Sequence, residues 1–360
     1  MQAEEPRRTF LTLDGLRGIG AFLVVTRHVP FLFGPFRAPE SFLAVDLFYL
    51  VSGFVVAHAY RVRLENGGFF GGFVKTRLIR LYPMYLCGLA FGLLAAVLSF
   101  ITDPAGWWTW EKLAYAVVTG LFMIPMVPGL VTNGSALDGP IWTLLPELIA
   151  NFTYAFFIRF LNLWVMCAII AVSGLGVVLA EFHYDSLDVG FGPTQQWAAL
   201  ARVFFSFFSG VVLFRLFGHV QKHVEWASWA CMAALTLLLI YQPNDDIKPW
   251  FELGAVMIGF PMLLVLAGCF EPSDRTGKIF SHIGLMSYGV YLLHQPVGNL
   301  VRIIIGRNTP VPTGPVVLIF GVAFLVGVTL LAGWLDKHYD GPVRKILRQR
   351  FMSDGAKKAA

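Results

Sequence analysis

The sequence predicts an all-α fold: a polytopic membrane helix bundle of about ten transmembrane helices with one re-entrant or interfacial segment. Hydrophobic residues make up 57% of the 360 residues and charged residues only 14%, which excludes an ordinary soluble domain. Apolar segments long enough to cross a bilayer also follow one another along most of the chain. We therefore expect one transmembrane domain over residues 1–340 and a basic cytoplasmic tail over 341–360.

The candidate crossings are ten apolar segments. Their bounds lie near 15–34, 42–60, 81–101, 141–160, 163–180, 198–218, 227–241, 251–270, 282–305 and 315–335. An eleventh apolar run, 113–127, is shorter and ends in a stretch that contains Pro and Gly. Because irregular backbone cannot face lipid, we expect this run to pack against protein without crossing.

Basic residues indicate the orientation. If 113–127 does not cross, the N-terminus is cytoplasmic, and 19 of the 27 Lys and Arg lie on cytoplasmic segments against five outside. If it crosses, twelve of those 19 move to the outer side. The positive-inside rule therefore favours ten crossings with both termini in the cytoplasm, and the charged N-terminus does not resemble a removable signal peptide.

Several other classes of site are not expected. The net charge of +5 comes mostly from short loops between apolar segments, so it gives no argument for binding nucleic acid. Four cysteines occur singly in or beside apolar segments, which indicates neither a disulfide framework nor a metal site. We also expect no permanently bound cofactor.

The first apolar segment carries two ionisable side chains, Arg17 and His28. Such groups are costly inside a bilayer, so they usually face a protein interior or a water-filled cavity and mark a site. Eleven residues are just over three helical turns, which places both side chains on one face about 16 Å apart along the axis.

Two carboxylates are expected at the depth of His28. Asp46 begins the second apolar segment and Glu147 begins the fourth, just after Pro146. A carboxylate beside an imidazole is an ordinary general-base pair, so we predict a catalytic cluster of His28, Asp46 and Glu147. The alternatives are a core histidine and independent structural contacts, such as a helix cap or an ion pair of Asp46 with Arg27.

Two further groups are candidate binding residues. Arg77 and Arg80 are three residues apart on one helix face, a spacing that suits a phosphorylated ligand, although basic residues at a cytoplasmic helix end also follow from topology alone. Tyr288, Tyr291 and His294 follow helical spacing within one apolar segment. They are expected either to line a cavity or to close a polar network inside the bundle.

Five fragments, in this order, resemble the membrane acyltransferase-3 family. Its members are integral-membrane O-acyltransferases that modify bacterial surface glycans, lipid-linked saccharides and some macrolides. The matching fragments, which lie between residues 11 and 296, are LDGLRGIGAFLVVTRH, VDLFYLVSGF, RLIRLYPMY, PIWTLLPE and SYGVYLLHQP. Where the family usually has serine in the fourth fragment, this chain has Thr143.

The resemblance implies roles for individual residues. His28 corresponds to the essential histidine of the first segment, with Arg17 as its paired basic residue. Arg77 and Arg80 correspond to the cytoplasmic arginine motif, and Glu147 to the acidic residue that follows the family's Trp-Ser-Leu segment.

The activity that the resemblance implies is transfer of an acyl group, which we expect to be acetyl, from cytoplasmic acyl-coenzyme A as co-substrate. The acceptor is a hydroxyl of a carbohydrate, glycolipid or glycosylated metabolite. The protein is expected to be a multi-pass protein of the bacterial inner membrane. The three arginines would bind the donor, and His28 would act as general base, oriented by Asp46 or Glu147. Direct transfer and a transient acyl-enzyme both stay open. The alternative function is a transporter or flippase that moves a glycan precursor without covalent chemistry.

Overall fold

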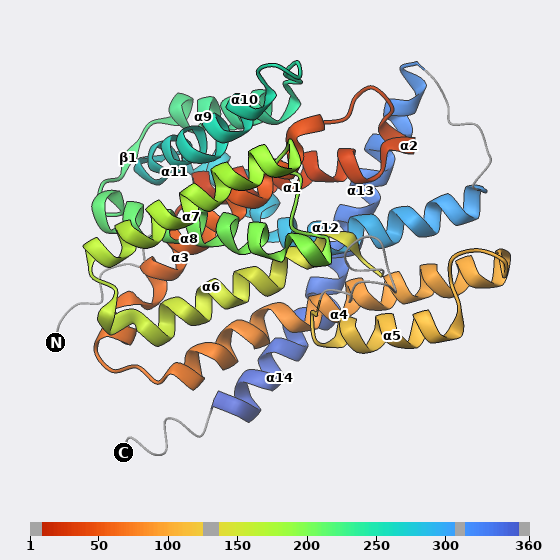
Figure 1. Ribbon diagram of the computed structural model, residues 1–360, viewed down its shortest axis with the longest axis horizontal. Coiled ribbons are helices and arrows are strands. Elements are labelled where there is room, and N and C mark those ends of the chain that lie inside the picture. The colour runs from red at the N-terminus through yellow and green to blue at the C-terminus, as the bar shows by residue number, and fades with distance from the viewer. Residues whose placement is uncertain (1–8, 125–136, 307–313, 353–360) are drawn as a thin grey trace.

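The computed structural model describes residues 9–124, 137–306 and 314–352. This part of the chain is almost entirely helical (Figure 1). Its α-helices are α1 Leu11–His28, α2 Pro30–Phe33, α3 Ala44–Glu65, α4 Phe70–Thr102, α5 Trp110–Leu121, α6 Leu144–Phe157, α7 Leu163–Tyr184, α8 Gln196–Phe217, α9 Glu225–Ile240, α10 Lys248–Gly254, α11 Phe260–Cys269, α12 Asp274–Ile305, α13 Val316–Leu335 and α14 Gly341–Met352.

Shorter elements join these helices. The 3₁₀ turns are η1 Pro39–Leu43, η2 Gly139–Thr143, η3 Ile158–Phe160 and η4 Pro193–Gln195, and the π-helical segments are η5 Ala255–Gly259 and η6 Asp336–Asp340. Two two-residue strands, β1 Lys222–His223 and β2 Phe270–Glu271, pair in parallel.

All ten predicted apolar segments coincide with helices in the part of the chain that the structure describes. By length and composition, six helical stretches in this part are suited to cross a membrane: Pro39–Glu65, Phe70–Thr102, Leu163–Tyr184, Pro193–Phe217, Lys248–Cys269 and Val316–Met352. α1 and α12 are not among them, since both carry polar and charged side chains along their length. The helical membrane class is therefore confirmed, and the count of ten crossings stays a prediction.

The short apolar run 113–127 forms part of α5, and its last residues, 125–127, lie outside the described residues. α5 has 12 residues, so it is about 18 Å long, well short of the ~30 Å hydrocarbon core. It packs on α4, whose Tyr82 and Tyr85 hydroxyls donate to the carbonyls of Leu121 and Gly120. This geometry agrees with a segment that packs against protein without crossing.

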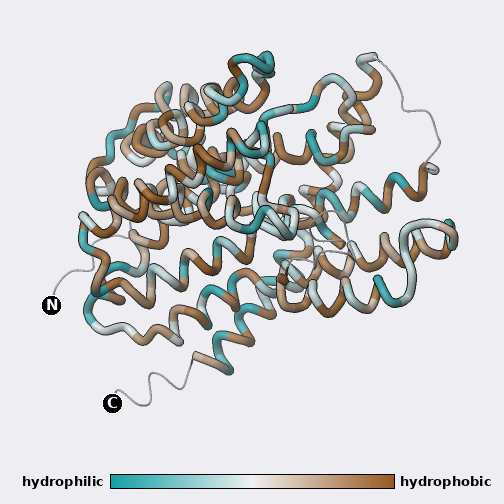
Figure 2. Tube along the Cα trace, in the orientation of Figure 1, coloured by the Kyte–Doolittle hydropathy of each residue, from teal (hydrophilic) through white to brown (hydrophobic). Residues whose placement is uncertain are grey.

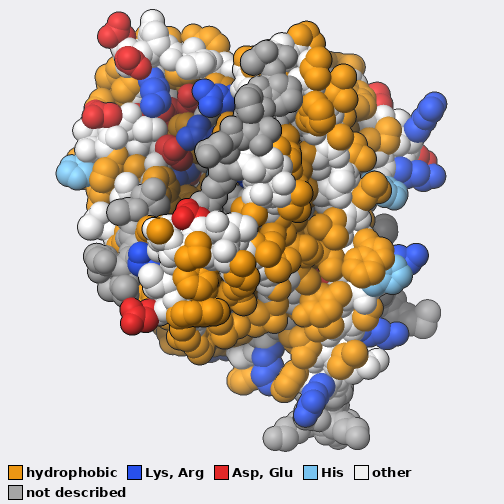
Figure 3. Space-filling model, turned by 90° about the vertical axis from the view of Figure 1, so that its right-hand side faces the viewer, with side chains coloured by type: hydrophobic (Ala, Val, Ile, Leu, Met, Phe, Trp, Pro, Cys, Tyr) orange, Lys and Arg blue, Asp and Glu red, His pale blue; other side chains and the backbone are white. Residues whose placement is uncertain are grey.

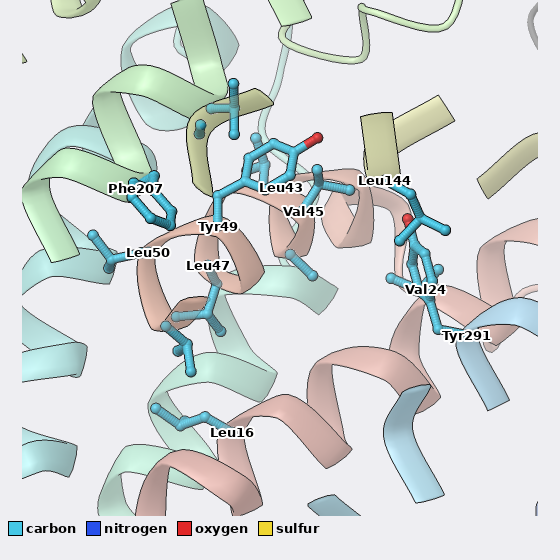
Figure 4. Packing of buried hydrophobic residues seen from close by; sticks show 14 of the residues in the cluster. Leu16, Val24, Leu43, Val45, Leu47, Tyr49, Leu50, Leu144, Phe207 and Tyr291 are labelled. Carbon is cyan, nitrogen blue, oxygen red and sulfur yellow. The ribbon is translucent and has the colours of Figure 1, made fainter. Parts of the chain in front are cut away.

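Small residues let the helices around the site approach closely. A Cβ at Gly53 of α3 would lie 1.9 Å from the carbonyl oxygen of Phe207 in α8, and a Cβ at Gly210 would lie 2.0 Å from that of Leu50. Close backbone contact of this kind is typical of membrane helix pairs. The side chains around these positions, including Tyr49 and Phe207, pack into one continuous core with Leu16 and Tyr291 (Figure 4).

The outer surface fits a membrane environment. Hydrophilic residues gather at turns and helix ends, while hydrophobic residues run along the helices (Figure 2). One face of the molecule is a broad hydrophobic surface with Lys and Arg side chains near its margins (Figure 3). α1 and α12 pack more extensively on each other than any other two elements of the described chain do, and Arg17 of α1 donates across this contact to the Ser287 hydroxyl of α12.

Candidate active site

Two cavities are lined by the predicted site residues other than Asp46 and His294. The first, which we call the arginine cavity, has a volume of about 340 Å³ and is lined by Arg17, Arg77, Arg80 and Arg344 among others. The second, the histidine pocket, has a volume of about 590 Å³ and is lined by residues that include Arg27, His28, Trp142, Asp188 and Gln295. α1 therefore contributes to both, with Arg17 in the arginine cavity and His28 in the histidine pocket.

Residues that are close together in the chain line the two cavities from η2 and from α12. Thr143 lines the arginine cavity and its neighbour Trp142 lines the histidine pocket. Thr143 Oγ1 and the Tyr291 hydroxyl are 3.1 Å apart, and the Tyr291 ring lies 6.0 Å from the ring of His294, centre to centre. We call Thr143, Tyr291 and His294 the partition. Tyr288, one turn before Tyr291, also lines the arginine cavity and donates a hydrogen bond to the Leu81 carbonyl.

Most of the arginine side chains in the arginine cavity have protein partners. Arg17 pairs with Asp14 at 3.3 Å and donates to the Gly284 carbonyl and the Ser287 hydroxyl, each at 3.3 Å. Arg77, almost fully buried, pairs with Glu147 at 3.2 Å. Arg17, Arg77 and Arg80 thus line one cavity, and their role in binding the donor stays a prediction.

The arginine cavity has as many carboxylates as arginines, but the ion pairs leave one arginine, Arg80, without a carboxylate. Four arginines line it together with four carboxylates, namely Asp14, Glu147, Asp336 and Asp340. Arg344 pairs with both Asp336 and Asp340. Arg80 is exposed to solvent and forms no hydrogen bond or ion pair that we find within the described residues, so its donors are available to a ligand.

His28 has a defined tautomer. Its Nδ1 lies 3.0 Å from the Val24 carbonyl oxygen, and because a carbonyl can only accept, Nδ1 carries the hydrogen of the neutral ring. Nε2 is then an acceptor, and the side chain lines the histidine pocket. The nearby guanidinium of Arg27 forms an ion pair with Asp188. His28 thus presents a basic nitrogen without help from a carboxylate.

Comparison with known proteins agrees with this architecture. A family model described as an acyltransferase domain, Acyl_transf_3, matches residues 10–334. The chain belongs to the acyltransferase-3 family. This membership confirms the predicted family and makes the chain a membrane acyltransferase, while nothing in these comparisons supports a transporter or flippase.

Individual relatives of this acyltransferase share between 22% and 38% of the aligned residues with it. A Rhizobium radiobacter protein named "Protein 2 in picA locus" is 38% identical over 200 residues, which are 51% of this chain and 100% of that protein. Peptidoglycan O-acetyltransferase OatA of Listeria monocytogenes is 22% identical over 84% of this chain, which spans about half (52%) of that protein's length. Acyltransferase MdmB of Streptomyces mycarofaciens is 24% identical, with 70% of this chain matched to 67% of it. No solved structure matches this acyltransferase.

Asp46 binds Arg202 and does not line the histidine pocket, contrary to the predicted cluster. It forms a buried ion pair with Arg202 of α8, at 2.5 Å with both side chains 1% exposed, and Arg202 Nε lies 3.2 Å from each carboxylate oxygen. The expected alternative, a pair of Asp46 with Arg27, is also absent, since Arg27 binds Asp188. The face that Asp46 occupies on α3 is set by packing against α8.

Glu147 likewise does not join His28. It begins α6 as predicted, but it lines the arginine cavity, where it accepts hydrogen bonds from Ser52 at 2.6 Å and Arg77 at 3.2 Å. The predicted convergence of His28, Asp46 and Glu147 is therefore wrong, because equal depth along three helices does not make their side chains face one another.

The sequence reasoning missed several residues of the site. Arg202 is a lone charge within an apolar segment, and that signal alone predicts a buried partner. Arg344 reaches the arginine cavity from α14, within the segment 341–360 that was expected to be a tail, and α14 packs on α4. Asp188 lies in a loop and carries no local pattern that would place it in the histidine pocket. Within the described residues, no group of His, Cys, Asp and Glu has the arrangement of a metal site.

Proposed function

We propose that this acyltransferase moves an acetyl group from acyl-coenzyme A to a hydroxyl of a saccharide or glycosylated acceptor. The carrying observation is that the arginine cavity and the histidine pocket meet at the partition, with Arg17 and His28 of the same helix on opposite sides. A phosphorylated donor needs cationic side chains and a hydroxyl acceptor needs a base, and the thioester and the hydroxyl must meet for transfer. The name of the Listeria relative supports O-acetyl transfer to a glycan.

The donor would bind in the arginine cavity. Arg80 is the first candidate for its phosphate groups because its donors are available, and a guanidinium binds phosphate oxygens through two parallel hydrogen bonds. Arg77 adds Nε, which is buried without a hydrogen-bond partner among the described residues. Arg17 lies deeper along α1 and would guide the pantetheine arm, so that the thioester reaches Tyr291 and Thr143 at the partition.

The acceptor would bind in the histidine pocket. His28 Nε2 would remove the hydroxyl proton as the oxygen attacks the thioester carbonyl, with Nδ1–H held on the Val24 carbonyl. That backbone bond does the orienting that a carboxylate does in other general-base pairs. Direct transfer requires both substrates at once, which two cavities on opposite sides of one partition permit; a transient acyl-enzyme would need a nucleophile at the same place.

The orientation is part of the proposal, with both termini and the arginine cavity on the cytoplasmic side of the bacterial inner membrane. Arg344 of α14 lines the same cavity as Arg77 and Arg80 of α4. The C-terminal helix and the beginning of α4 therefore lie at one end of the bundle. This is expected when the chain between them crosses the membrane an even number of times. The excess of basic residues on these segments supports the cytoplasm as that side.

Sealed membrane vesicles test activity and orientation together. Acetyl-coenzyme A does not cross membranes, and inside-out vesicles expose the cytoplasmic face of the enzyme. When acetyl-coenzyme A is added, inside-out vesicles should therefore acetylate the glycan fraction and right-side-out vesicles should not. The measurement is the acetyl mass shift of the glycans by mass spectrometry, with His28→Ala vesicles as the control. Glycan movement across the membrane without a mass shift would favour a flippase and contradict the proposal.

Arg80→Gln is expected to weaken donor binding and spare the chemistry. The substitution removes the guanidinium that has no carboxylate partner, so KM for acetyl-coenzyme A should rise about tenfold while kcat stays within about twofold, as expected for the loss of one charge-assisted contact. Lys75→Gln, an exposed basic residue at the same end of α4, is the matched control and should leave both constants unchanged. An unchanged KM in Arg80→Gln would remove Arg80 from the donor site.

A further inference from the structure

His294 lies between the two cavities on α12. Tyr291, three residues before it, lines the arginine cavity, and Gln295, the next residue, lines the histidine pocket. Tyr291 and Gln295 are four residues apart, a rise of only about 6 Å along the helix. His294 itself is 0% exposed. It therefore lies where a donor in one cavity and an acceptor in the other would come together.

The hydrogen bonding of His294 is incomplete. Its Nδ1 lies 3.1 Å from the Val290 carbonyl oxygen, so Nδ1 carries the hydrogen and Nε2 is the acceptor. Nε2 is buried and has no hydrogen-bond partner within the described residues. A buried acceptor without a donor is unfavourable, and native proteins contain few of them. A donor that is present only during the reaction would explain this one.

His28 supplies such a donor when it is protonated. The rings of His28 and His294 are 5.1 Å apart, centre to centre, at an interplanar angle of 63°. Both hold Nδ1–H on the carbonyl four residues earlier in their own helix, so the neutral pair has two acceptor nitrogens and no hydrogen to share. Once His28 takes a proton, its Nε2 gains a hydrogen, and the neighbouring ring of His294 carries an acceptor without a partner.

We propose that His294 carries the acceptor's proton from His28 to the departing sulfur of the thioester, a role that rests on the proposed function. The acceptor O–H bond breaks and its proton goes to His28 Nε2 as the oxygen forms a bond to the carbonyl carbon. The proton passes to His294 Nε2, and as the C–S bond breaks it forms the S–H bond of coenzyme A. Both imidazoles end as they began, and no oxidant or further reactant is needed.

The positions of the two cavities explain why a proton relay would be needed. The proton is released in the histidine pocket, whereas the thiolate leaves into the arginine cavity. An alkyl thiolate is a basic leaving group, so its departure is faster when a proton reaches it. His28 faces only the first side, and His294 is the titratable group of the partition that touches its ring.

The leaving group decides between a relay and a structural role. The full-length protein in detergent would be assayed with acetyl-coenzyme A and with the acetyl thioester of 4-nitrothiophenol, whose thiol leaves without a proton. For His294→Gln we expect a loss of about 10²-fold with acetyl-coenzyme A and less than about threefold with the aryl thioester. For His28→Gln we expect comparable losses with both donors. Because each variant is compared with itself, the ratio does not depend on the fraction of protein that is folded.

Either of two results would contradict the relay. Equal losses with both donors in His294→Gln would show that the side chain only supports the structure. Full activity of His294→Gln with acetyl-coenzyme A would show that no proton passes through it. A His28→Gln variant that keeps its activity would instead contradict the base of the proposed function, and so the two failures are distinguishable. His282→Gln is the matched control, since exposed His282 of α12 has the same Nδ1 contact, with the Lys278 carbonyl.

Discussion

Replacing His28 with alanine is expected to lower the rate of acyl transfer by about 10²–10⁴-fold, the usual contribution of a general base. His28 lines the histidine pocket with Nδ1–H committed to the Val24 carbonyl, so Nε2 is the nitrogen that an acceptor hydroxyl can reach. The loss should appear in kcat, because the imidazole acts on the proton in the transition state, whereas KM for acetyl-coenzyme A should change little. Steady-state rates of coenzyme A release by the purified protein measure both constants.

The control for His28→Ala is a histidine with the same backbone contact outside the cavities. His282→Ala removes an exposed imidazole whose Nδ1 lies 2.8 Å from the Lys278 carbonyl, and it should keep full activity. Equal membrane yield and equal melting temperature for the two variants would show that His28→Ala is folded. Turnover of folded His28→Ala within about threefold of the parent would contradict a base that should contribute at least about 10²-fold.

The arginine cavity was predictable because the residues that form it are misplaced in a membrane segment or share a helix face. Arg17 is an ionisable group in the first apolar segment, and Arg77 and Arg80 are three residues apart at the start of another. Polar groups in a bundle cluster around common cavities, because lipid excludes them. Helical spacing placed Tyr288, Tyr291 and His294 on one side of a helix and left open whether they line a cavity or close a polar network. Tyr288 and Tyr291 line the arginine cavity, whereas His294 is among the lining residues of neither cavity.

The pairing of residues across helices could not be predicted in the same way. Depth along a helix follows from counting residues, but the direction of a side chain relative to its neighbours depends on helix rotation and packing. Gly53 and Gly210 bring α3 against α8, and this contact turns Asp46 toward Arg202. Similarly, the place of Glu147 follows from Arg77 and Ser52, which lie on two other helices. A single sequence does not show how each helix is rotated relative to its neighbours, and so it does not show which side chains pair.

Asp46→Asn is expected to destabilise the fold by about 3–5 kcal/mol, the usual cost of breaking a buried ion pair by removing one partner. Asp46 and Arg202 are each 1% exposed, and the carboxylate accepts from both Nε and Nη2 of the guanidinium. The amide of the variant keeps one acceptor oxygen but carries no charge, so the guanidinium of Arg202, which also donates to the Val189 and Phe42 carbonyls, stays buried without a counter-charge. The free energy of unfolding in mixed detergent and SDS micelles measures the loss.

A control on the same helix separates burial from charge. Glu65→Gln weakens the contacts of Glu65, whose side chain is 42% exposed, with Arg61 and Arg215 at the end of α3. A pair with an exposed carboxylate contributes about 0–1 kcal/mol, so this variant should unfold almost as the parent does. The double variant Asp46→Leu with Arg202→Met removes both buried charges and should recover most of the stability that Asp46→Asn loses. If Asp46 instead served the chemistry of His28, Asp46→Asn would lose activity at unchanged stability, and the double variant would be inactive although folded. A stable and active double variant would leave the ion pair as a structural contact between α3 and α8, which holds the walls around the cavities in place.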